Sequence, residues 1–135
     1  MKKIISLILI LTIVLSIAGC AYQPKAEKGE LLNEGKIEKV ELMLMPEMST
    51  YTAEGKDAQA LIDCVEELEL TTEYSTDPNM YDAKAWILTF NYSNGETLKI
   101  NLFGNKFVRL AGKDWFEIPE ELGNKFETAI QNIIK

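Results

Sequence analysis

The stretch that decides the fold is residues 84–103, KAWILTFNYSNGETLKINLF. Apolar residues alternate with other residues on both sides of a Ser-Asn-Gly triplet, which is typical of two strands joined by a tight turn. A two-residue loop would send the two apolar sets to opposite faces, whereas a three-residue loop with Gly95 at positive φ keeps them on one face. The second arrangement pairs residues whose numbers sum to 188. It predicts a bulge at Gly95 and the cross-strand pairs Phe90–Leu98, Leu88–Ile100 and Trp86–Leu102.

The other elements follow outward from this hairpin. Apolar residues recur every three or four positions in 56–70 and again after Pro119, which predicts two amphipathic helices. Alternation and turn residues predict the rest, namely strands at 36–45, 106–110 and 114–118 and loops at 47–55 and 71–82. The order is strand, helix, four-strand antiparallel meander, helix. It is typical of an α+β fold with both helices packed on one face of the sheet.

The N-terminus has the pattern of an export signal. Residues 4–18 form an uncharged, mostly apolar run behind two lysines, as in a secretory signal peptide. The four residues Ile17, Ala18, Gly19 and Cys20 resemble the lipobox of bacterial lipoproteins. This resemblance implies a diacylglycerol on the Cys20 sulfur and cleavage between Gly19 and Cys20. It also implies a mature protein that is anchored by lipid on the extracytoplasmic face of the cell membrane.

An uncleaved transmembrane anchor is the alternative, because no charge occurs over residues 4–24, a length that can cross a bilayer of about 30 Å. Both interpretations place the rest of the chain outside the cytoplasmic membrane. We expect three parts, namely a lipoprotein signal peptide at 1–19, a flexible tether at 20–35 and a single α+β domain at 36–135. Leu31 and Leu32 are apolar enough to dock on the domain, so the sequence does not fix the boundary between tether and domain near residue 35.

Composition limits the chemistry of the domain. The net charge is −7 and becomes −9 without Lys2 and Lys3, which argues against a nucleic acid or an anionic lipid as partner. The chain has no histidine, which removes Ser-His-Asp and Cys-His catalysis and histidine-ligated metals. No motif predicts a metal or a cofactor beyond the covalent lipid on Cys20. The layout resembles the small extracytoplasmic lipoprotein domains of Gram-positive bacteria that lack an assigned activity, and this resemblance carries over no functional residue.

Cys64 is the only cysteine besides Cys20. It lies on the flank of the apolar helix stripe among acids, so we expect a buried core residue and not a reactive thiol. The acids around it lack the spacing of a calcium-binding loop and are expected to form a solvated helix face. They are Asp63, Glu66, Glu67, Glu69 and Glu73. No catalytic residue is predicted.

Aromatic residues and methionines outside the predicted core supply the candidate interaction surface, because such side chains favour interfaces when they are exposed. Trp115 belongs to it if its neighbour Phe116 points into the core. The surface consists of Met48, Tyr51, Tyr74, Met80, Tyr81 and Trp115. The alternative is that these side chains close the ends of a small core.

The sequence therefore favours a non-enzymatic binding or interaction module for a protein or an envelope ligand. Two alternatives stay open: an immunity or inhibitor lipoprotein against a secreted toxin or lytic enzyme, and an envelope hydrolase that uses two carboxylates. A flat surface with exposed aromatics would favour binding. A deep pocket with two convergent acids would favour hydrolysis.

Overall fold

The structure, a computed structural model, describes residues 29, 31–70, 73–74, 83–110 and 114–135. Four predicted site residues lie outside these ranges, namely Gly19, Cys20, Met80 and Tyr81. The described chain has the predicted α+β fold. Its elements are β1 (Ile37–Met45), β2 (Ser49–Ala53), α2 (Gly55–Glu66), β3 (Glu73–Tyr74), β4 (Ala85–Tyr92), β5 (Thr97–Phe103), β6 (Phe107–Leu110), β7 (Trp115–Glu117) and α3 (Glu120–Ile133).

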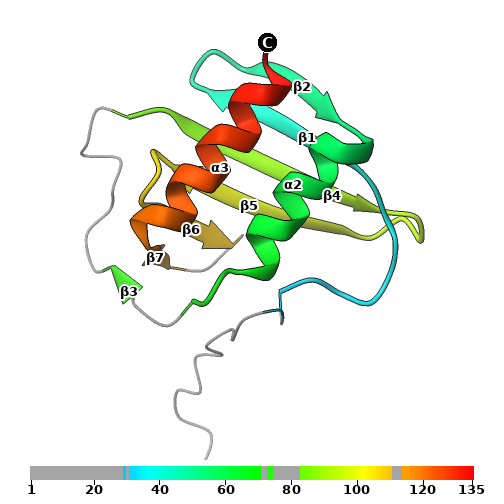
Figure 1. Cartoon of the computed structure of the whole chain (residues 1–135), viewed down its shortest axis with the longest axis horizontal. Coiled ribbons are helices and arrows are strands. Elements are labelled where there is room, and N and C mark those ends of the chain that lie inside the picture. Colours follow the sequence, from blue (N-terminus) through cyan, green and yellow to red (C-terminus); the bar gives the residue numbers. More distant parts are fainter. Residues whose placement is uncertain (1–28, 30, 71–72, 75–82, 111–113) are drawn as a thin grey trace, which may run out of the picture.

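The described strands form one antiparallel sheet of seven strands in the order β2-β1-β4-β5-β6-β7-β3. The run from β4 to β7 is the predicted meander. Helices α2 and α3 lie side by side across one face of this sheet (Figure 1). The opposite face, here called the open face, has no helix of the described chain over it. None of the helices in the described ranges is long and apolar enough to cross a membrane.

The β4–β5 hairpin confirms the predicted register. Phe90 lies opposite Leu98, and the pairs Leu88–Ile100 and Trp86–Leu102 follow. Gly95 has φ +87°, and its N–H donates to the carbonyl of Tyr92 at 3.0 Å. The three-residue loop therefore forms as predicted, because only this loop length keeps both apolar sets on the helix side.

Residues 49–53 are a strand, so the prediction of a loop at 47–55 is wrong. β2 pairs with β1 and places Tyr51 opposite Leu42 and Ala53 opposite Val40. Its inward residues are half-buried or buried, and Thr50 and Thr52 point outward and are exposed. With one aromatic and one small inward residue, the alternation of β2 is too weak to stand out in the sequence.

The helices begin as predicted, but α2 ends at Glu66 and not at residue 70. Acids crowd its last turn, which contains no basic residue, and negative charge at a helix C-terminus opposes the helix dipole. Leu68 and Leu70 are nevertheless fully buried, so the apolar pattern continues while the backbone leaves the helix. α3 follows Pro119 directly, as predicted.

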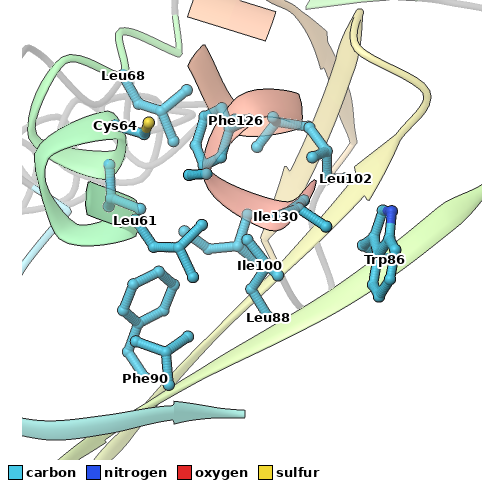
Figure 2. Packing of buried hydrophobic residues seen from close by; sticks show 14 of the residues in the cluster. Leu61, Cys64, Leu68, Trp86, Leu88, Phe90, Ile100, Leu102, Phe126 and Ile130 are labelled. Atoms are coloured by element: carbon cyan, nitrogen blue, oxygen red, sulfur yellow. The ribbon is translucent and has the colours of Figure 1, made fainter. Parts of the chain in front are cut away.

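The core lies between the two helices and the sheet. Figure 2 shows Leu61 of α2 and Phe126 and Ile130 of α3 with the strand residues Leu88 and Ile100. All five side chains are buried. Trp86 and Phe90 stand at opposite ends of this packing along β4 (Figure 2).

Gly123 lets α3 approach the β5–β6 turn. A Cβ at this position would collide with the carbonyl oxygen of Asn105 and lie 2.8 Å from its carbonyl carbon. The Asn105 side-chain amide also donates to Asn124 Oδ1 at 3.1 Å. The glycine that weakens the helix in isolation is therefore what allows this contact between helix and turn.

Residues 31–35 lie against the domain, although the predicted boundary places them in the tether. Leu31 and Leu32 pack against the core, and the Asn33 N–H donates to Tyr92 Oη at 3.1 Å. Gly35 lies against the Tyr92 ring so closely that a Cβ would be 3.3 Å from it. We call residues 31–35 the strap. The docking of the two leucines is confirmed, and the flexible tether predicted at 20–35 must be shortened to exclude the strap.

Candidate functional site

The structure separates the predicted surface residues. Met48 and Tyr51 lie in and beside the β1–β2 turn, whereas Tyr74 lies in β3, whose backbone pairs with that of Trp115 in β7. Met48 is 59% exposed and Tyr51 is half-buried. Of the described members, only Met48 and Tyr51 therefore lie in the same hairpin, formed by β1 and β2.

Trp115 is not a surface residue, so its place in the predicted interaction surface is wrong. It is 8% exposed and packs on the open face with Phe103 and Phe107. The Phe103 ring meets it at a centroid distance of 6.1 Å, and the guanidinium carbon of Arg109 lies 4.6 Å from its ring centroid. The prediction that it points away from Phe116 holds, but a second small apolar cluster on that side buries it.

A groove opens between the C-terminal half of α3 and the first residues of β4. The Met48 N–H, in the β1–β2 turn, donates at 2.8 Å to the carbonyl of Leu44, whose strand partner Trp86 lines the groove. The volume of the groove is about 390 Å³. We call it the α3 groove. Buried apolar side chains form its floor, namely Trp86, Leu102 and Ile130, and the exposed Ile134 lies at its edge. Hydrogen-bonding side chains form its rim, namely Lys84, Asn105, Glu127 and Gln131.

Trp86 links this groove to the β1–β2 hairpin. Its ring is tilted at 58° to the Tyr51 ring, with 6.1 Å between the centroids. Such tilted aromatic pairs add about 0.5–1.5 kcal/mol beyond area burial and hold both rings in place. Two large apolar side chains are exposed among the described residues. Met48 lies in the β1–β2 turn and Ile134 directly follows α3.

Sequence reasoning placed Trp86 in the core and did not find this groove. Trp86 does belong to the core cluster, with 7% of its surface exposed. The groove arises where α3 crosses the sheet near the start of β4, so that Trp86 and Ile134 line the same hollow. The crossing position of a helix depends on packing along its whole length and leaves no local signal in the sequence.

The open face is a second surface. Register places Met43, Ile87 and Asn101 in one row across β1, β4 and β5. A hollow of about 640 Å³ lies over these strands. Beside it, Lys39 Nζ contacts Glu41 Oε1 at 3.0 Å. The hydrogen bond from Lys39, followed by one from Asn91, lowers the pKa of the Glu41 carboxyl.

Cys64 is a buried core residue, as predicted, and is 4% exposed. Burial, together with the nearby carboxylates of Glu67 and Asp63, raises the pKa of its thiol to about 11. A thiol with this pKa is almost entirely protonated at neutral pH and is a poor nucleophile. Lys125 Nζ of α3 lies 2.9 Å from Glu67 Oε2 at the end of α2, so one acid of this cluster has a basic partner. The hydrogen bond to Glu67 raises the pKa of Lys125.

The carboxylates of the described residues are all outside the core. Across residues 31–70, 83–110 and 114–135, no charged or polar side chain is buried. No group of three or more Cys, Asp or Glu residues in the described part of the chain is close enough together to hold a metal ion. The hydrolase alternative therefore gains no support from these residues.

Comparisons with protein-family models, with curated proteins and with solved structures found no match for this chain.

Proposed function

We propose that this protein is a lipid-anchored, extracytoplasmic binding module that contacts a partner through the α3 groove and the adjoining β1–β2 turn. The lipobox-like residues 17–20 supply the anchor, with Cys20 carrying the lipid. The folded domain supplies the binding surface. It has no enzymatic role in this proposal.

The α3 groove carries the proposal. It combines a tryptophan in its floor with the exposed Ile134 at its edge and a rim that can donate and accept hydrogen bonds, and the exposed Met48 lies in the turn next to the strand partner of that tryptophan. Interfaces depend on a few buried aromatic or aliphatic anchors inside a polar rim, and this groove presents that arrangement before any partner arrives. Its side chains do not converge on a pair of acids, which is the arrangement that hydrolysis of an envelope glycan would require.

Site-specific photocross-linking in living cells tests the proposal. A benzophenone amino acid at Ile134, on the edge of the groove, is compared with the same amino acid at Thr52, which is exposed on the open face. We expect a discrete cross-linked protein at position 134 that is absent at position 52. The same adducts at both positions, or none at 134, would contradict a binding role for the groove.

Two substitutions provide a matched control for the cross-link. Met48→Asp introduces a charge beside the groove, and Thr52→Asp introduces the same charge on the other face of the same hairpin. Both positions are exposed, so neither change removes a core contact. We expect M48D to weaken the cross-link at position 134 and T52D to leave it unchanged.

A further inference from the structure

The strap and the α3 groove lie at opposite ends of the same strand. Tyr92, which the strap contacts, ends β4, and Trp86, in the floor of the groove, lies near its start. Six residues of extended chain separate them by about 20 Å. Figure 1 shows the strap at the edge of the molecule opposite the C-terminus. Ile134, next to the C-terminal residue, lines the groove.

The strap also limits how far the domain can move from an anchor on Cys20. Eleven residues lead from Cys20 to Leu31, the first strap residue that packs on the core. A chain of this length spans at most about 40 Å when fully extended. Without the strap, the five residues to Gly35 would add about 17 Å of reach.

From this geometry we infer that attachment through the strap keeps the α3 groove on average farther from the membrane than the strap end of the domain, so that an extracytoplasmic protein can insert an apolar side chain into the groove. This inference rests on the proposed lipid anchor. The domain cannot enter the membrane to which it is attached, so the end of the domain that is not attached lies on average farther from the membrane than the strap end. The net charge of −9 on the mature chain also disfavours contact between the domain and anionic lipids.

A protein, and not the bilayer, is therefore the occupant that fits the groove. The strap attaches at the Tyr92 end of β4 and the groove lies at the Trp86 end, so in the inferred orientation the groove is the end farther from the bilayer. The groove is small, and its rim carries Lys84 and Glu127, so both a positive and a negative side chain border an apolar floor. A single inserted side chain with hydrogen bonds around it satisfies such a site, whereas an acyl chain would leave the polar rim without partners.

Fluorescence energy transfer to labelled lipid tests the orientation. The full chain is produced with its lipid, extracted and reconstituted into phosphatidylcholine vesicles that contain an acceptor on a lipid headgroup. A donor is attached to Ser93→Cys, beside the strap, or to Met48→Cys, beside the groove. The Ser93 N–H donates to the Lys36 carbonyl at 2.8 Å, so position 93 reports on the strap end of the domain. Cys64 is buried and protonated and does not take the label.

We expect a larger loss of donor fluorescence at S93C than at M48C. Equal losses, or a larger loss at M48C, would overturn the inference, and the second result would indicate that the groove contacts the bilayer. In L31S/L32S, which releases the strap, the difference between the two positions should shrink. Failure of the protein to float with the vesicles would instead show that the lipid anchor is absent, and both proposals would fall.

Discussion

Because α3 contacts the β5–β6 turn at Gly123, we expect Gly123→Ala to destabilise the protein. Glycine inside a helix is less favourable than alanine by about 1 kcal/mol, so helix propensity alone predicts that the substitution stabilises the protein. The structure predicts the opposite sign, because the added methyl group would occupy the position of the Asn105 carbonyl oxygen. α3 or the turn would have to move.

The expected change in the free energy of unfolding is the cost of overpacking minus the gain in helix propensity. Overpacking costs typically about 1–3 kcal/mol. Here the colliding atoms belong to backbone and not to the end of a flexible side chain, which places the cost in the upper part of that range. After the gain in helix propensity is subtracted, we expect a net loss of about 1–2 kcal/mol in the free energy of unfolding.

Urea unfolding followed by tryptophan fluorescence measures this loss, since Trp86 and Trp115 are both buried in the folded state. Thr128→Ala, at an exposed position of the same helix, is the control and should change stability by no more than about 0.5 kcal/mol. A G123A protein as stable as the unmodified chain, or more stable, would refute the close approach of helix and turn.

Three further predictions concern single residues. A thiol reagent at pH 8 should label Cys64 only after denaturant unfolds the protein, because the thiol is buried and its pKa is raised to about 11. Rapid labelling of the native protein would contradict its burial. Gly95→Ala should lower the free energy of unfolding, measured in urea, by about 1–2 kcal/mol. At this position φ is +87° and a Cβ would have free space, so backbone strain is the sole cost. An unchanged midpoint would show that the turn is not left-handed. The pKa of Glu41 is lowered in the folded state, so its contribution to stability is present above its ordinary value of 4.5 and is lost as pH falls below it. Glu41→Gln should therefore slightly reduce the loss of stability between pH 7 and pH 3, and identical pH profiles would contradict the Lys39 contact.

The parts of the fold that follow from alternation could be predicted from the sequence. The β4–β5 register was decided by which faces the two apolar sets occupy, and burial enforces that choice in the structure. The weak alternation of β2 concealed a strand whose inward residues include a single aromatic, Tyr51. The end of α2 was placed too late because Leu68 and Leu70 continue the apolar pattern beyond the last helical turn.

The candidate site could be predicted only in fragments. The sequence predicts Met48 and Tyr51 as residues available for contact, and the structure places both in the β1–β2 hairpin, with the Tyr51 ring against Trp86. Trp115 was misplaced because its burial depends on neighbours contributed by β5 and β6. The α3 groove and the role of Gly123 depend on where a helix crosses a sheet, which is a property of the assembled layers.

The lipid anchor is the claim on which the proposed function depends, and an intact-mass measurement of the protein extracted from membranes tests it most directly. We predict a chain that begins at Cys20 and carries the added mass of a diacylglycerol on that cysteine. A chain that retains Met1 and the leader, with an unmodified Cys20, would contradict the account.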